Sequence, residues 1–375
     1  MNIIRNFWTN KKLKAATVVS LTVVLLFALS AIIFTLFKVS SLKAYDILFL
    51  MPFNDINHFH NFVNSFSYLL LASLASLVAF RFRIYNLGVI GQMIIGATIT
   101  FITSRLLSAV GITNKFTTML LILVSIIVGA LYALIAGFFK TYFKINEMAS
   151  TLLLNIIAFN IYYHLPEWSQ YNDGIINNNA SLIIKLSMTV YLSITIFIAL
   201  FIYGFVTILL DRRVFGFCLE LTVANAEAAQ YARLNPNAKQ LIIMTISGAI
   251  AGIAGYTYFV ANLNKLGRLS STMLQEFDNL LIPLWAFNSR IGVLLLSILV
   301  GLIRSQTQFL SLTSFDYEII DIIFSFCITI SVLVSYIILW KQEPKFLINF
   351  RMREALVNQR PDVNDATNII NKGRR

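Results

Sequence analysis

The residues best suited to chemistry in this sequence are polar side chains that stand inside otherwise apolar stretches. Asn86, Gln92, Asn155, Asp278 and Asn288 each lie in or beside a signal for a break in a helix. Amide groups in such places suit a neutral solute with hydroxyl groups or a nucleobase, for which one lost hydrogen bond costs about 1–3 kcal/mol. Because polar groups at membrane depth face a cavity or a partner, we expect these five residues around one solute path.

Patterns for catalysis and metal binding are missing from the sequence. It contains no Gly-x-x-x-x-Gly-Lys-Ser/Thr, Gly-x-Ser-x-Gly or His-Glu-x-x-His motif, so we expect no ATP site, catalytic residue or cofactor. His58 and His60 stand in a short polar stretch without a third ligand at suitable spacing, and are expected at the surface rather than on a metal. Cys218 and Cys327 are expected to be small apolar fillers.

The composition is that of a protein that uses lipid as its solvent. Hydrophobic residues make up 58% of the 375 residues and charged residues 12%, with a mean hydropathy of +0.77. Ala15–Phe37 has no charge over 23 residues, about 34 Å as a helix against a bilayer core of about 30 Å. We interpret this run as a retained anchor, because it is too long for a signal peptide. The net charge of +12 lies at helix ends and in the tail, which favours anionic lipid over nucleic acid as its partner.

The sequence predicts an all-α, multi-pass protein of the plasma membrane with about ten transmembrane helices. Between Leu280 and Phe315 the apolar pattern is broken near Asn288 and again at Arg304, which predicts two interrupted helices. The other expected spans are uncharged runs at Ala15–Phe37, Phe62–Phe80, Ile84–Ser104, Phe116–Phe139, Met148–Leu165, Leu186–Leu210, Gln240–Asn264 and Ile322–Trp340.

The distribution of basic residues predicts that both termini lie in the cytoplasm. With ten spans, 21 Lys and Arg residues fall on the cytoplasmic side and seven on the other, with Arg304 left in the membrane. The expected organisation is a cytoplasmic arm at 1–14, a transmembrane domain at 15–340 with a cytoplasmic loop at 211–240, and a basic cytoplasmic tail at 341–375. Arg304 is expected to snorkel, to pair with an acid such as Asp321, or to touch solute.

The loop Gly216–Pro236 is polar and rich in alanine, although apolar helices flank it on both sides. Its Ala-Glu-Ala-Ala core, followed by a basic residue and a proline-ended turn, resembles the cytoplasmic coupling loop of ATP-driven importer permeases. The resemblance implies that the segment docks on an ATPase. The residues expected to do so are Ala226, Glu227, Ala228, Ala229, Tyr231 and Ala232.

Three further segments resemble motifs of sugar and nucleoside permeases in ABC importers of the branched-chain amino acid/ribose type. Ile84–Gly96 is similar to the Phe-Asn-Ile-Gly-x-Glu-Gly-Gln signature, with Ile90 in place of Glu. Glu147–Asn155 is similar to Glu-x-x-Ser-Thr-x-x-x-Asn. Phe277–Val293 follows Phe-Asp-Gly-Ile-Ala-Val-Ala-Leu-Leu-Gly-Arg-Asn-x-Pro-x-Gly, with Ala286 and Arg290 replacing glycine and proline. Taken alone, the glycines also suit close helix packing, and an intramembrane Asn also suits a bond to a neighbouring helix.

The resemblance covers roughly Phe62–Ile303 and implies a permease subunit for nucleosides or simple sugars. It implies a second permease subunit, identical or homologous, a separate ABC ATPase and an extracellular substrate-binding protein. The implied substrate-pathway residues are Asn86, Gly88, Gln92, Thr151, Asn155, Phe277, Asp278 and Asn288. The alternative is a secondary transporter driven by an ion gradient, which has no need of a docking loop; an intramembrane enzyme is a third class without a catalytic constellation.

Small residues on two of the expected spans predict close helix contact rather than chemistry. Ser247, Gly248, Gly252 and Gly255 form such a face within Gln240–Asn264. Gly129, Ala133 and Gly137 form another on an earlier span. We therefore expect these two spans to pack tightly.

Overall fold

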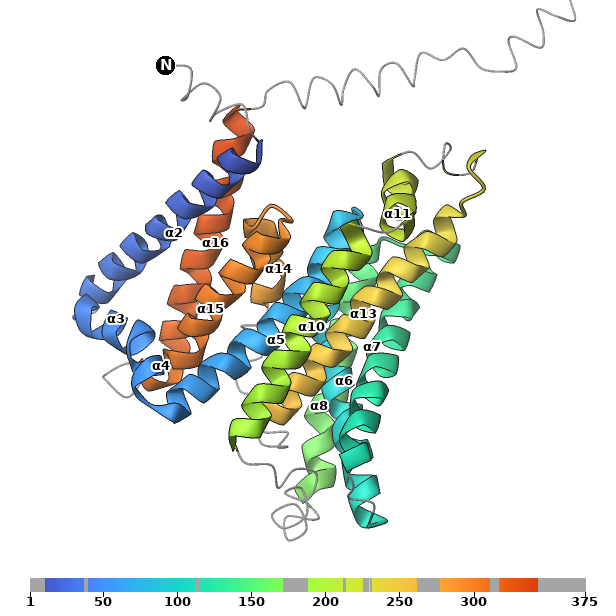
Figure 1. The fold of residues 1–375 in the computed structure, drawn as a ribbon, viewed down its shortest axis with the longest axis horizontal. Coiled ribbons are helices and arrows are strands. Elements are labelled where there is room, and N and C mark those ends of the chain that lie inside the picture. The colour runs from blue at the N-terminus through green and yellow to red at the C-terminus, as the bar shows by residue number, and fades with distance from the viewer. Residues whose placement is uncertain are drawn as a thin grey trace, which may run out of the picture.

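The fold is known from a computed structural model that describes residues 11–36, 40–111, 115–170, 188–211, 214–224, 229, 231–261, 277–310 and 317–342 (Figure 1). Within these ranges all regular structure is helical, which confirms the all-α class. The helices are α2 (Lys11–Leu36), α3 (Ser41–Phe49), α4 (Met51–Asn54), α5 (Ile56–Arg81), α6 (Val89–Ala109), α7 (Lys115–Phe143), α8 (Glu147–Gln170), α10 (Met188–Asp211), α11 (Val214–Ala224), α13 (Pro236–Ala261), α14 (Asp278–Trp285), α15 (Arg290–Leu310) and α16 (Tyr317–Gln342).

Five helices of the described chain are long and apolar enough to cross a membrane. Their candidate spans are Ala15–Thr35, Ile56–Arg81, Val89–Leu107, Thr117–Phe143 and Pro236–Tyr258. Shorter apolar stretches occupy Glu147–Tyr162, Thr195–Leu210 and Phe324–Ile337, where other spans were expected. The total of ten crossings and the cytoplasmic termini stay predictions. Residues 1–10 and 343–375, which include most of the expected arm and tail, lie outside the described residues.

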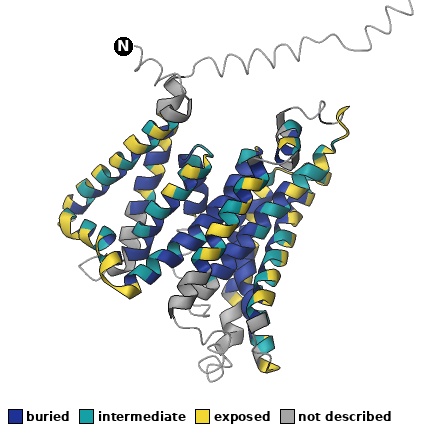
Figure 2. Ribbon diagram, viewed as in Figure 1, coloured by how far each residue is buried: buried dark blue, intermediate teal, exposed yellow. Residues whose placement is uncertain are grey.

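Helix α5 lies at the centre of the bundle (Figure 2). In its most apolar window 83% of the residues are buried, against 28% in α2 and in α7. It packs against α13 and α6 on one side and against α14 and α15 on the other. We call α6, α7, α8 and α13 the glycine-packed block, and α2, α3, α14, α15 and α16 the pair-linked block. Helix α5 joins the two.

The glycine-packed block is held by direct contact between helix backbones. A Cβ atom at Gly252 of α13 would collide with the carbonyl oxygen of Ser125 on α7, and one at Gly96 of α6 would lie 3.1 Å from the Cα atom of Gly252. Gly129 and Gly248 meet in the same way. The small faces predicted from the sequence are therefore confirmed as packing surfaces, since only a missing side chain allows such approach.

The pair-linked block is held by larger side chains that reach from helix to helix. Trp285 of α14 donates its indole N–H to the Thr22 hydroxyl of α2 at 2.8 Å, and Ser335 of α16 donates to the same oxygen at 3.0 Å. Phe34 of α2 packs edge to face against Phe324 of α16 at a centroid distance of 6.0 Å. These contacts join three helices that are far apart in the sequence.

The expected break near Asn288 is confirmed, whereas the one at Arg304 is wrong. Helix α14 has eight residues, about 12 Å and too short to cross a bilayer. It ends before Phe287 and Asn288, whose φ angles of 50° and 56° are left-handed. Helix α15 then continues through Arg304 to Leu310. Arginine is a good helix former, and here an ion pair neutralises its charge, so the backbone has no reason to break.

Candidate functional site

A non-helical turn between α5 and α6 carries the first group of expected pathway residues. Helix α5 ends at Arg81 and α6 begins only at Val89, so the span expected from Ile84 starts five residues later. Arg83 has a φ of 54°, and Asn86 is fully buried. The Asn86 side chain accepts a hydrogen bond from the Gly88 N–H at 3.0 Å, which competes with helix formation at this point. The interruption is therefore a buried turn before the helix, not a break within it.

Asn86 and Gln92 form a reciprocal amide pair across this turn. Asn86 Nδ2 donates to Gln92 Oε1 at 3.1 Å, and Gln92 Nε2 donates to Asn86 Oδ1 at 3.0 Å. Asn86 Nδ2 also donates to the Ser247 hydroxyl of α13 at 2.8 Å. Ser247 in turn donates to the Ala75 carbonyl of α5 at 2.7 Å. The turn is thus tied to both neighbouring helices.

Asn155 of α8 fastens the same turn from the other side. Its Oδ1 accepts from the Gly91 N–H at 2.9 Å, and its Nδ2 donates to the Leu87 carbonyl at 2.8 Å. A Cβ atom at Gly91 would lie 2.6 Å from Asn155 Oδ1, and one at Gly88 would lie 3.0 Å from Thr151 Cβ. The structure therefore brings Asn86, Gly88, Gln92, Thr151 and Asn155 together, and we call these five residues with Ser247 the amide cluster.

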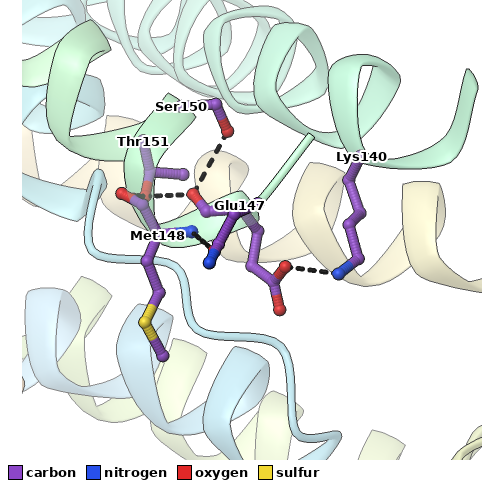
Figure 3. Close-up of polar contacts among 6 residues, drawn as sticks. Lys140, Glu147, Met148, Ser150 and Thr151 are labelled. Atoms are coloured by element: carbon purple, nitrogen blue, oxygen red, sulfur yellow. Dashed lines mark hydrogen bonds and ion pairs between the residues drawn. The ribbon is translucent and has the colours of Figure 1, made fainter. Parts of the chain in front are cut away.

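The start of α8 is set by an ion pair that sequence reasoning missed. Lys140, in the last turn of α7, donates to the Glu147 carboxylate at 2.5 Å (Figure 3). Lys144 turns the chain with a φ of 55°, and Asn146 caps α8 by accepting from the Met148 N–H at 2.9 Å. The Thr151 hydroxyl donates to the Glu147 carbonyl at 2.7 Å. The signal was present in the sequence as opposite charges on either side of a short polar break.

The second group of expected pathway residues lies around α14, in the pair-linked block. Arg304 Nε donates to Asp278 Oδ2 at 2.6 Å, and Arg304 Nη2 donates to Asp278 Oδ1 at 3.1 Å and to the Ser325 hydroxyl at 2.8 Å. Both charged side chains are only 2% exposed. Pairing of Arg304 with an acid is confirmed, but the acid is Asp278. The side chain of Asp321 lies outside what the structure describes.

The other two residues expected beside Asp278 differ in exposure. Phe277 is half-exposed. Asn288 sits at the break between α14 and α15, and its buried Oδ1 has no hydrogen-bond partner within the described chain. The set expected around one path is thus divided between the amide cluster and the surroundings of α14. Contact of either group with solute stays a prediction.

The expectation that His58 and His60 lie at the surface is wrong. They are 7% and 6% exposed. Helix α5 begins at Ile56 with Asp55 as its cap, so both rings fall within its first two turns. His58 Nδ1 lies 2.8 Å from Gln306 Oε1 of α15, and His60 Nδ1 lies 3.0 Å from Asn64 Nδ2. Among the residues that the structure covers, no group of three potential metal ligands occurs. The burial of His58 could not be read locally, because its partner Gln306 lies 248 residues away.

The expected docking loop is described in part. Helix α11 (Val214–Ala224) forms the first part of the segment Gly216–Pro236, and Ala226, Glu227 and Ala228 lie outside the described residues. Ala229 is buried, whereas Ala232 is exposed and Tyr231 is 91% exposed. The turn ends at Asn235, whose Oδ1 accepts from the backbone N–H groups of residues 237 and 238 at 3.0 and 3.3 Å and so caps α13.

Comparison with known proteins gives one family and several relatives. The model of the family described as "Branched-chain amino acid transport system / permease component" matches residues 59–339. The chain is 23% identical over 330 residues to the nucleoside ABC transporter permease protein NupB of Lactococcus lactis, covering 84% of this chain and 90% of that protein. It is 25% identical over 333 residues to the guanosine ABC transporter permease protein NupP of Bacillus subtilis, covering 85% and 93%. No solved structure matches.

Proposed function

The chain belongs to the permease components of branched-chain amino acid transport systems, and from this premise we propose that it forms the nucleoside pathway of an ATP-driven importer. It is a multi-pass membrane permease of the ABC-transporter class and acts in transport rather than as an enzyme. The observation that carries the proposal is the extent of the family match. It runs from the first turn of α5 into α16 and so includes both groups of polar residues.

Nucleosides are the proposed solutes for two reasons. Two relatives that align over most of this chain are described as nucleoside and guanosine permeases. The amide cluster also consists of neutral groups, which match the hydroxyl groups and base edges of a nucleoside without demanding a charge. Simple sugars share the hydroxyl chemistry, but no relative named above is described as a sugar permease.

The proposed pathway passes both polar groups. One wall is the amide cluster, through Asn86, Gly88, Gln92, Thr151 and Asn155. The other is the α14 region, through Phe277, Asp278 and Asn288. The short α14 and the turn before α6 support this assignment, because non-helical backbone at membrane depth is tolerated where it meets protein or a water-filled path.

The proposed topology has about ten crossings with both termini in the cytoplasm. The arm at 1–14, the loop at 211–240 and the basic tail at 341–375 then lie on the cytoplasmic side of a transmembrane domain at 15–340. The excess of basic residues on that side supports the arrangement. The tail and arm would lie against anionic lipid.

The proposed partners are a separate ABC ATPase, a second permease subunit and an extracellular substrate-binding protein. The second permease is identical or homologous. Docking of the ATPase is assigned to Ala226, Glu227, Ala228, Ala229, Tyr231 and Ala232. The high exposure of Tyr231 and Ala232 supports this choice, since an aromatic side chain that is free at the surface suits a protein interface.

The docking proposal predicts that Ala228→Arg abolishes copurification of the ATPase. A long charged side chain would prevent close packing of small residues in a cleft, while insertion into the membrane stays normal. The matched control is Asn237→Arg, an exposed residue in the first turn of α13 that is not among the assigned docking residues. Unchanged association and uptake in Ala228→Arg would contradict the docking role.

Reconstitution tests the proposed function as a whole. The purified chain alone in liposomes should show no uphill nucleoside uptake under a proton or sodium gradient. Adding the ATPase, the binding protein and any partner permease should confer uptake that requires ATP. Concentrative uptake by the lone chain under an ion gradient would contradict the proposal and favour the secondary transporter.

A further inference from the structure

The side chain of Asn86 uses every hydrogen-bonding group that it has. A primary amide offers two donor hydrogens and an oxygen with two lone pairs. In Asn86 the two donors go to Gln92 and Ser247, and the oxygen accepts from Gly88 and Gln92. Its burial does not set it apart, since Gln92 and Asn155 are buried as well. A solute could therefore bind to Asn86 only by breaking a bond that holds the turn.

Gln92 and Asn155 differ from Asn86 in this respect. Within the described chain, the side-chain amide of Gln92 donates one hydrogen bond and accepts one, both with Asn86. The amide of Asn155 also makes one of each, to Leu87 and Gly91. Each keeps one donor hydrogen and one lone pair. That pair of groups is what a hydroxyl or a nucleobase edge requires.

We infer that Asn86 is a positioning residue, which with Ser247 fixes the turn before α6 so that Gln92 and Asn155 can present their remaining groups to the solute. This inference rests on the proposed function and deepens it. It separates the expected pathway residues into one that shapes the site and two that are free to contact solute.

The anchoring of Ser247 explains why Asn86 can hold the turn rigidly. Ser247 lies on α13 and donates to the Ala75 carbonyl of α5. Helix α13 is itself locked against α7 and α6 by contacts at Gly252 that leave no room for a Cβ atom. The chain of bonds therefore runs from the turn into the most closely packed part of the molecule. Without Asn86, Gln92 would lose both of its bonds and sample other rotamers, since a free Gln side chain gains conformational entropy.

A positioning role and a contact role predict different results with different solutes. Loss of positioning lowers the fraction of transporters in the competent geometry, which reduces uptake of every solute by the same factor. Loss of a contact affects most the solute that makes the contact. The diagnostic quantity is therefore the ratio of Vmax/KM values for guanosine, 2′-deoxyguanosine and uridine.

The experiment measures ATP-driven uptake of these three nucleosides by the reconstituted complex. Ser247→Ala and Asn86→Ala should each lower Vmax/KM for all three by a common factor of about fivefold or more, as expected for a lost buried hydrogen bond. Because they share one bond, the double variant should be less impaired than the product of the two factors. Gln92→Ala and Asn155→Ala should change the ratio between solutes. Ser76→Ala is the matched control, because its buried hydroxyl has no partner in the described chain.

Asn86→Ala could fold poorly, which would lower uptake without testing the inference. Ser247→Ala removes only one oxygen atom, and comparing its monodisperse yield with that of Ser76→Ala shows whether it folds normally. A change in the solute ratio in Asn86→Ala or Ser247→Ala would overturn the inference and make Asn86 a contact residue. Ser247→Ala behaving like Ser76→Ala would overturn it as well. A wild-type complex without ATP-driven nucleoside uptake would instead contradict the proposed function, and the positioning role would fall with it.

Discussion

The two blocks on either side of α5 are held together by different physical means. In the glycine-packed block, α7, α6 and α13 touch backbone to backbone, and the bonds of the amide cluster come from short amide and hydroxyl side chains. In the pair-linked block, the helices are joined by long side chains, with Trp285 and Arg304 as the largest. The first block resists sliding because its surfaces interlock. The second block shares the apolar core of the molecule, and its bonds to Trp285 and Arg304 lie buried within that core, where a broken bond leaves a polar or charged group without its partner.

The difference also bears on transport. A pathway that opens and closes needs one part that keeps its shape and another that can shift. Close backbone packing suits the constant part, since it has no alternative arrangement of side chains. Bonds between long side chains can break and form again, which suits the short α14 and its break at Asn288. The three predictions below probe this comparison by removing one element of each kind.

The largest effect is expected for Asp278→Asn in the pair-linked block. The change keeps the size of the side chain but leaves the Arg304 charge buried without its counter-charge, and breaking a buried pair costs about 3–5 kcal/mol. Thermal unfolding of the purified protein should show a lower Tm and a reduced folded fraction. Uptake by the complex should fall as well.

Two further variants make the Asp278 prediction specific. Asp278→Asn combined with Arg304→Gln removes both charges and should recover part of the lost stability. Asp46→Asn alters an exposed carboxylate on α3 and should leave the Tm unchanged. If the Tm of Asp278→Asn equalled that of Asp46→Asn, the Asp278–Arg304 pair would not hold the pair-linked block together. The contrast between the two blocks would then be lost.

A smaller loss of stability is expected for Gly252→Ala in the glycine-packed block. The added methyl group would collide with the Ser125 carbonyl oxygen and approach the Gly129 Cα atom to 3.3 Å. Overpacking of this kind costs about 1–3 kcal/mol, although alanine is the better helix former by roughly 0.5–1 kcal/mol. The net effect should be a lower Tm with retained folding.

Gly204→Ala in α10 is the control for the Gly252 variant. Within the described chain, no neighbouring helix comes within 4 Å of a Cβ built at Gly204, so only the gain in helix propensity remains and the Tm should rise slightly. A lower Tm for Gly252→Ala together with a higher Tm for Gly204→Ala would support the packing argument. A rise in Tm for both would show that α7 and α13 can separate at no cost.

Much of the fold was readable from the sequence because its signals are local. The uncharged runs predicted most of the long helices, and the small residues at 248, 252 and 129 predicted close helix contact, although not which helices would meet. The break after α14 was visible as Asn-Ser-Arg in an apolar context. In each case the property that identifies the element lies within a few residues of it.

The parts that were missed depend on partners distant in the sequence. His58 was expected at the surface, because nothing near it reveals that Gln306 covers it. Pairing with an acid such as Asp321 was one of three expectations for Arg304, and the acid that it contacts is Asp278, on a helix before the break at Asn288. The saturation of Asn86 also requires Ser247, 161 residues further on. Such bonds depend on which helices pack together in the folded protein, and that cannot be read from a single sequence.

The smallest effect is expected for Lys140→Gln at the edge of the glycine-packed block. The Lys140 side chain is 35% exposed, and its ion pair with Glu147 is therefore screened by solvent and contributes about 1 kcal/mol or less to stability. Uptake should respond more than the Tm, because Glu147 opens the helix that carries Thr151 and Asn155 into the amide cluster. Lys144→Gln, an exposed neighbour, is the control and should change neither quantity. A large fall in Tm for Lys140→Gln would mean that a partly exposed pair matters as much as the buried pair of Asp278 and Arg304, and burial would then not explain the difference between the two blocks.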